Sequence, residues 1–305
     1  MVSSITLLTA LLVGASTIAA SPALVSRAGV TTLSGPEILA YEPYAKLARA
    51  AYCSSAQLQT WTCGTACNDL SGMTDITTGG GGLVDSLRAK WYVGYYPPLN
   101  TIVVSNQGAD ASELSSLFDV AFIPTSLNPG LFPGVPSNVR VHAGFQINQA
   151  SGASAKLAAV KALIAKYPSA STTCTGLGHG GAIAFLDALH FLLHIPEPKI
   201  KVVTHGMPRV GNQEFANYFD NHLNDVSRIT NRKDIIPILP GRFLGFHHSQ
   251  GEKHILARGV WVACAGQENT DAQCIAGAVP NVLAGDIEDH PGPYNDIMID
   301  GGACN

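Results

Sequence analysis

The sequence predicts an α/β fold in which a mainly parallel sheet is flanked by helices. Strand candidates at 171–175, 199–204 and 226–230 alternate with segments of helical spacing. Such alternation favours parallel strands joined by crossover helices. The roughly 280 residues that follow the apolar N-terminus are long enough for one large domain with a generous core.

The remaining elements follow from local patterns along the chain. Residues 40–52 have the spacing of an amphipathic helix, and residues 154–167 repeat it. Residues 91–96 and 101–105 are strand candidates, because a turn with two prolines and an asparagine separates them. A Gly-rich turn after the first central strand leads into a helical stretch over 182–193.

The N-terminus is typical of an exported protein. Apolar and small residues run from Ile5 to Ala20, and the run ends in a small-residue cleavage pattern. We expect a signal peptide over 1–20, a pro-segment over 21–27 and a single secreted domain over 28–305. The apolar run is too short for a transmembrane segment, and no later stretch reaches spanning length.

Composition excludes one class of partner and favours another. The net charge is -4 and the pI is near 6.2, and the sequence shows no clustered stripe of basic residues. Nucleic acid is therefore not an expected partner. Charged residues make up only 13% of the chain, which suits a large core or a surface that meets apolar material. We expect a monomer without a cofactor.

Seven cysteines in an exported chain predict disulfides. Cys63 and Cys67 are close enough to close a small loop, and Cys264 and Cys274 can do the same. The pair Cys53–Cys304 would then tie the N-terminal helix to the C-terminus, which leaves Cys174 as a buried thiol in a central strand.

Metal binding is not expected from the cysteines or the histidines. There is no Cys-x-x-Cys pair of the kind found in zinc sites. His190 and His194 stand four apart on a segment of helical spacing, but no third ligand is evident beside them.

The Gly-rich segment 175–182 has the setting of a nucleophile elbow, where a strand, a sharp turn and a helix expose a catalytic serine. The frame Gly-x-Ser-x-Gly is filled by Gly176, Gly178 and Gly180, so the middle residue has no hydroxyl. A remote alternative is dinucleotide binding, because Gly176, Gly178 and Gly181 also spell Gly-x-Gly-x-x-Gly. That motif needs an acid at the end of the next strand, where this chain has His205.

Six segments in one order resemble the class 3 lipases of fungi, a family of secreted α/β-hydrolases that includes feruloyl esterases. The resemblance runs from about Tyr41 to Cys304. The segments are VHAGF at 141–145, GLGHGGA at 176–182, MPRVGN at 207–212, TNRKDIIP at 230–237, FHHSQGE at 246–252 and DHPGPY at 289–294. The resemblance implies the α/β-hydrolase fold with a short lid, and it implies the same cysteine pairing.

Catalytic roles are implied residue by residue. Asp234 matches the triad acid and His290 the triad base, and both follow the nucleophile position in the usual chain order. Gly178 stands where the family has serine. The backbone N–H groups of Ala109 and His179 would form the oxyanion hole, although the usual side-chain hydroxyl is missing at Ala109. His247, His248 and His254 belong to a family segment without a metal role and are expected to be structural.

A lid is expected over 110–122, ahead of the elbow. Its apolar residues share helical spacing and would meet lipid or cover an acyl groove: Leu114, Leu117, Phe118 and Phe122. The expected partners are therefore an ester or lipid substrate and the lipid–water interface.

The implied lineage is carboxylic ester hydrolysis, most plainly of acylglycerols, as in a triacylglycerol lipase or carboxylesterase. Acyl transfer needs an oxygen or sulfur nucleophile beside the base, and glycine supplies neither. One hypothesis is a lipid- or ester-binding protein with weak or lost catalysis. The alternative is an active hydrolase. Either it uses a non-standard nucleophile, for which the candidates are Thr173, Cys174, Thr175 and His179, or the sequence contains an error at 178.

Overall fold

A computed structural model describes residues 29–81, 89–109 and 124–305 of the chain. The expected signal peptide, pro-segment and lid, with Leu114, Leu117, Phe118 and Phe122, lie outside these ranges. Within them, nine strands form one sheet in the order β1-β13-β12-β10-β8-β7-β4-β3-β2. Among the described residues no helix is long and apolar enough to cross a bilayer.

The centre of the sheet is parallel, as predicted. Its five strands are β4 (Thr101–Asn106), β7 (Ser171–Leu177), β8 (Ile200–His205), β10 (Val226–Asn231) and β12 (Glu252–Ala257). Antiparallel strands complete both edges: β2 (Thr74–Gly79) and β3 (Trp91–Tyr96) on one side, and β13 (Val260–Cys264) and β1 (Val30–Thr32) on the other. Because the carboxyl ends of parallel strands share one edge, the loops after β7, β8 and β10 meet there.

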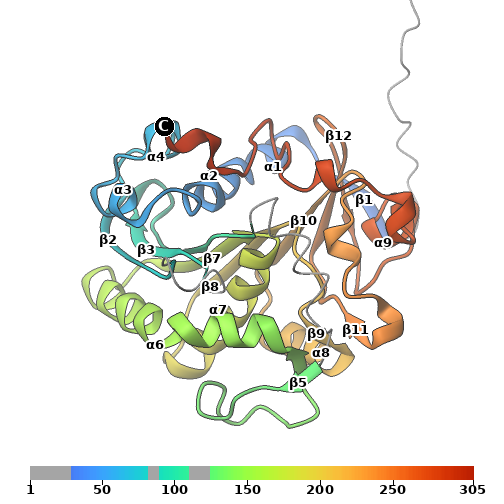
Figure 1. The fold of residues 1–305 in the computed structure, drawn as a ribbon, viewed down its shortest axis with the longest axis horizontal. Helices are drawn as coiled ribbons and strands as arrows, with labels where there is room; N and C mark the ends of the chain where they lie inside the picture. Colours follow the sequence, from blue (N-terminus) through green and yellow to red (C-terminus); the bar gives the residue numbers. More distant parts are fainter. Residues whose placement is uncertain (1–28, 82–88, 110–123) are drawn as a thin grey trace, which may run out of the picture.

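Helices cover both faces of the sheet (Figure 1). One face carries α6 (Ala143–Lys166), α7 (His179–His194) and α8 (Gln213–His222), which share a core cluster with the central strands. The other face carries α1 (Gly35–Leu39), α2 (Glu42–Ala50), α3 (Ser55–Thr60) and α4 (Gly64–Asn68), which share a second cluster. The central strands β4, β7, β8 and β10 are thereby almost wholly removed from water.

Short elements fill the loops. A four-stranded sheet has the order β11-β9-β6-β5, with β5 (Pro124–Ser126), β6 (Arg140–His142), β9 (Gly211–Asn212) and β11 (Phe246–His247). The remaining short helices are η1 (Pro97–Leu99), η2 (Ile236–Ile238), η3 (Arg242–Leu244), α9 (Ile275–Ala278), η4 (Val282–Ala284), η5 (Ile287–Asp289) and η6 (Gly301–Cys304).

Helix α6 begins eleven residues before the start predicted at 154, because Ala143 is its first residue. The early turns are small and polar, so they lack the apolar spacing on which the prediction depends. Gly152 lies so close to the indole of Trp91 that a Cβ there would stand 2.9 Å from Nε1. Apart from Phe145, which joins the core, these turns are buried by close approach and by the polar contacts of Gln149.

The disulfides of the structure join Cys53–Cys304, Cys63–Cys67 and Cys264–Cys274, which are the pairs expected from the sequence. Cys174 is a buried free thiol, also as expected. The Cys53–Cys304 bridge spans 251 positions, and closing so long a loop restricts the unfolded chain by several kcal/mol.

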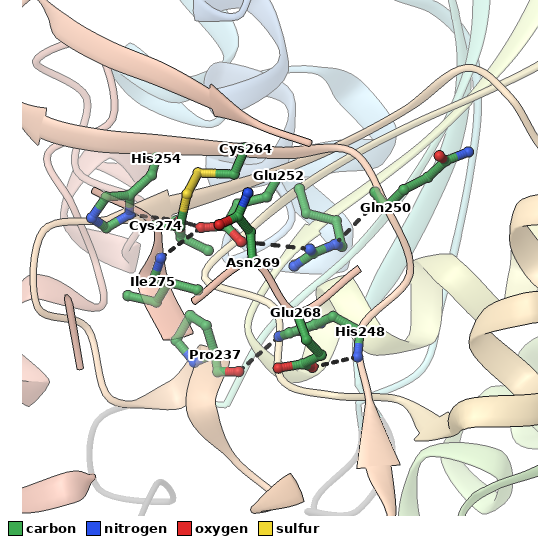
Figure 2. Close-up of polar contacts among 12 residues, drawn as sticks. Pro237, His248, Gln250, Glu252, His254, Cys264, Glu268, Asn269, Cys274 and Ile275 are labelled. Carbon is green, nitrogen blue, oxygen red and sulfur yellow. Dashed lines mark hydrogen bonds and ion pairs between the residues drawn. A yellow bond between two sulfur atoms is a disulfide. The ribbon is translucent and has the colours of Figure 1, made fainter. Parts of the chain in front are cut away.

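A buried polar layer lies between strands β10 and β12 and the loops that cover them (Figure 2). The Arg228 guanidinium stands 3.8 Å from the Glu252 carboxylate, which also accepts the backbone N–H of Ile275 at 2.7 Å. His254 shares a 2.8 Å hydrogen bond with Thr230. Burial lowers the pKa of His254 to about 4, so this imidazole is neutral at pH 7.

We expect this neutral histidine to make the fold sensitive to acid. Its pKa is lower in the folded chain than in the unfolded chain, so between pH 6.5 and 4 the unfolded chain binds the extra proton. Stability therefore falls as pH falls through this window, by about 2 kcal/mol at pH 5 for one such group. His254→Gln should reduce the loss between pH 7 and pH 5, measured by urea unfolding.

His222→Gln is the matched control, since His222 lies exposed at the end of α8. Buried carboxyl groups such as Glu252 have a raised pKa, so their contribution to stability changes with pH in the opposite direction. Comparing the variants with the original chain cancels this contribution. Equal losses in the His254 variant and the original chain would contradict the assignment.

Candidate active site

The elbow is a sharp turn centred on Gly178. Strand β7 ends at Leu177, Gly178 has φ 52° and ψ −117°, and α7 begins at His179. The N–H of Gly178 donates to the carbonyl of His205 at 2.8 Å, which ties the turn to the end of β8. A Cβ at position 178 would stand 2.6 Å from Nε2 of His290. Any side chain here would therefore face the imidazole.

His290 and Asp234 form a buried pair behind this position. Nδ1–H of His290 donates to Oδ2 of Asp234 at 2.8 Å, and both side chains are almost fully buried. The other carboxylate oxygen accepts the N–H of Ile236 at 2.8 Å, and the Tyr294 hydroxyl donates to the carbonyl of His290. Burial raises the pKa of the Asp234 carboxyl, and the adjacent imidazole opposes this shift.

Gly206, which no sequence motif singles out, makes room for the pair. It follows β8 with φ +52°, and a Cβ there would stand 2.8 Å from both Asp234 Oδ2 and the His290 ring. A larger residue would separate the carboxylate from the imidazole. The one sequence signal is a glycine directly after a buried strand.

The segment that ends at Ala109 lies against the elbow. A Cβ on Gly180 would overlap the carbonyl of Asn106, and a Cβ on Gly108 would stand 2.5 Å from the carbonyl of Leu177. Backbone therefore packs directly on backbone where β4 ends and α7 begins. This places the stretch with the expected oxyanion N–H of Ala109 beside that of His179.

Comparisons with known proteins agree with this geometry. The model of the class 3 lipases matches residues 103–244. A secreted mono- and diacylglycerol lipase of Malassezia restricta, LIP2, is 28% identical over 198 residues, which cover 63% of this chain. The chain thus matches only 61% of the length of that relative.

Solved structures extend the likeness to most of the chain. Lipase II from Rhizopus niveus aligns with a TM-score of 0.78 and 26% identity over 90% of this chain and 99% of that one. A triacylglycerol lipase described as having a serine protease triad at its catalytic centre aligns with a TM-score of 0.77 and 27% identity, over 91% of this chain and 100% of that one.

These comparisons support a place for the chain in the class 3 lipase family. Its α/β-hydrolase fold, with the mainly parallel sheet flanked by helices, is the one the sequence resemblance implies. Of the site residues predicted for this lipase-family chain, the structure brings Gly178, Asp234 and His290 together.

The other nucleophile candidates are poorly placed in this family fold. Thr173 is buried and shares a 2.8 Å hydrogen bond with Thr101, and Thr175 is fully buried in the same strand. Burial raises the pKa of the Cys174 thiol, so it does not ionise readily. His179 packs edge-on against Phe145 at 5.3 Å, and burial lowers its pKa to about 4.

One cluster of potential metal ligands occurs among the described residues: Glu252, Cys264 and Cys274, with ligand atoms within 4.8 Å of one another. The two sulfur atoms are joined in a disulfide, so no thiolate is available there. Figure 2 shows this bridge beside Glu252. The cluster is better explained as structural.

A fully buried charge network holds the end of β4 against α6 and α7. Lys156 Nζ contacts Asp187 Oδ2 at 2.5 Å and the side-chain oxygen of Asn106 at 3.1 Å. Asn106 and Gln149 both donate to the Asp187 carboxylate, at 3.0 and 3.2 Å. Because Asn106 is the last residue of β4, the network positions the segment that reaches Ala109.

A second network holds the loop that follows Asp234. Arg209 forms a two-point pair with Glu268, at 2.7 and 2.8 Å, and donates to the carbonyls of Ile238 and Pro240. His248 shares a 2.7 Å hydrogen bond with the carbonyl of Pro237, and its backbone N–H donates to Glu268 (Figure 2). Asp234 thus lies at the start of a loop whose later residues are fixed by these hydrogen bonds.

Removing one charge of the first network should be costly. Asp187→Asn leaves Lys156 charged, buried and without its counter-ion, so the free energy of unfolding should fall by about 3–5 kcal/mol. Combining it with Lys156→Met should recover part of this loss, because the stranded charge is also removed. Urea unfolding at pH 7 measures both effects.

The matched control is Asp225→Asn, which breaks the exposed Lys201–Asp225 pair and should change stability by less than about 1 kcal/mol. If Asp187→Asn lowers the free energy of unfolding no more than Asp225→Asn does, the buried network does not have the proposed role in stability.

Proposed function

We propose that this chain is a secreted protein of the acylglycerol-hydrolase lineage that binds ester or lipid and has lost most of its catalysis. The observation that carries the proposal is the position of Gly178. A Cβ at this position would stand 2.6 Å from Nε2 of His290, and His290 is hydrogen-bonded to Asp234. Glycine therefore stands where the family geometry requires a hydroxyl.

The Asp234–His290 pair supports a retained acid–base half of the machinery. A carboxylate at Nδ1 orients an imidazole so that Nε2 takes a proton from a nucleophile in front of it. Gly178 offers no such proton and no oxygen for an acyl-enzyme. Loss of a triad serine elsewhere lowers kcat about a million-fold. A slow direct attack by water, with His290 as base, is the residual activity we propose.

Lipid recognition is supported by exposed apolar side chains on the loops that flank the pair. Phe243 is 90% exposed on η3, which follows the Asp234 loop, and Leu283 is 95% exposed on η4, which precedes His290. A contiguous exposed apolar patch is typical of a surface that meets other apolar material, and we propose that these two side chains contribute to one. We propose that both insert at a lipid–water interface, in agreement with the named activities of the relatives.

Restoring the nucleophile should restore hydrolysis. Gly178→Ser places a hydroxyl before His290, whose ring must retreat slightly because the new Cβ would stand 2.6 Å from Nε2. We expect initial rates on a short activated ester to rise at least about a hundredfold. Adding Leu177→His, His179→Leu and Ala109→Thr should raise them further by rebuilding the turn and the hole.

Gly178→Ala is the matched control, because it adds the Cβ without the oxygen and should stay inactive. His290→Ala in the rebuilt chain should abolish the gain. If the original chain already matches the serine variant, the nucleophile lies elsewhere and the alternative of an active, non-standard hydrolase is favoured. If folded serine variants stay inert, Asp234 and His290 are not a catalytic pair.

The interface proposal has its own test. Phe243→Ser with Leu283→Ser should weaken co-sedimentation with a triolein emulsion by about tenfold or more, because two apolar side chains no longer leave water. Ile147→Ser is the control, since Ile147 is 68% exposed on α6. Equal binding of the double variant and this control would refute the assignment of the surface.

A further inference from the structure

A pocket, here named the outer pocket, lies on the α1 side of the sheet. Its volume is about 310 Å³, within the size range of small-molecule sites. It is bounded by α1, by the hairpin between β12 and β13, and by the segment that follows His290. Figure 1 shows α1, β12 and the C-terminal segment on the same side of the molecule. Neither Gly178, Asp234 nor His290 lines it.

The inner surface of the outer pocket is apolar. Ile38, Ile255 and Trp261 form its floor, and each is nearly buried. Leu39 and Pro293 stand at the edge, and Leu39 is 61% exposed although it is a large apolar side chain. Such a floor with an unburied leucine favours an aliphatic chain as occupant.

The charged side chains at the rim differ in how closely they are paired with other charges. Glu42 is paired with Lys46 at 2.7 Å, and Asp296 accepts two hydrogen bonds from Arg258 at 2.7 and 3.1 Å. Arg232 differs, because its nearest acid, Asp289, is 3.8 Å away. Within the described part of the chain, its guanidinium makes no hydrogen bond and the side chain is 44% exposed, so N–H donors are available to a ligand in the pocket that Arg232 lines.

We propose that the outer pocket binds a long-chain fatty acid, with the carboxylate on Arg232 and the chain along Trp261 and Leu39. A guanidinium presents paired donors that match the two oxygens of a carboxylate. Glu42 and Asp296 line the same pocket, which disfavours a doubly charged phosphate and favours a single negative charge. The site is independent of ester hydrolysis at position 178.

Tryptophan quenching tests this site directly. The chain has three tryptophans, and Trp261 is the one in the pocket. Stearic acid brominated at mid-chain should quench the tryptophan fluorescence of the native protein saturably, at concentrations below the critical micelle concentration of the acid. Trp261→Phe should remove that quenching. The methyl ester of the same acid lacks the carboxylate and should bind at least about tenfold more weakly.

Arg232→Gln should weaken the quenching about tenfold, whereas Arg258→Gln, at the same rim but already bound to Asp296, should change it less than twofold. Both are partly or largely exposed, so both variants should fold. The proposal is overturned if acid and methyl ester quench Trp261 alike, or if the two arginine variants behave alike. Quenching that arises from an acyl groove near His290 would instead persist in the Trp261→Phe variant and would also occur with the methyl ester. The two sites are therefore distinguishable.

Discussion

Direct packing of backbone on backbone at the elbow is the constraint on which the candidate site depends. Gly176 and Gly180 lie so close to each other and to the carbonyl of Asn106 that neither has room for a Cβ. Without this contact, α7 could not start immediately after β7, and the segment after β4 could not pass over the turn. Both expected oxyanion N–H groups, at Ala109 and His179, belong to the peptides adjoining this crossing.

Buried charge holds the pieces that the crossing brings together. Lys156 and Asp187 sit where three elements meet, and Arg209 with Glu268 holds the loop after the acid. Burying such pairs is not by itself stabilising, because desolvation offsets most of the attraction. Their effect here is positional, since a shifted β4 end or acid loop would leave buried charges without partners.

The sequence identifies best what local chemistry dictates. The central strands were predictable because their β-branched residues stand between turn signals, and Asp234 and His290 lie in distinctive segments. The start of α6 was not, because its early turns lack regular apolar spacing and Gln149 is buried there by a contact with Asp187, which lies far away in sequence. Strand β2 escaped notice because TDITTG is a polar edge segment whose pairing depends on β3. The need for glycine at 206 depends on the side chains of Asp234 and His290, which lie far away in sequence.

The glycine at 178 changes the balance between stability and chemistry in a predictable direction. The turn holds this residue at φ 52°, a conformation that strains a residue with a Cβ but not glycine. A serine here would meet both this strain and a close contact with the His290 ring. Glycine relieves both, so a chain that no longer needs the hydroxyl would gain stability at this position while its neighbours kept their places. The intact Asp234–His290 pair is therefore compatible with lost catalysis, because nothing in its own hydrogen bonding requires a side chain at 178.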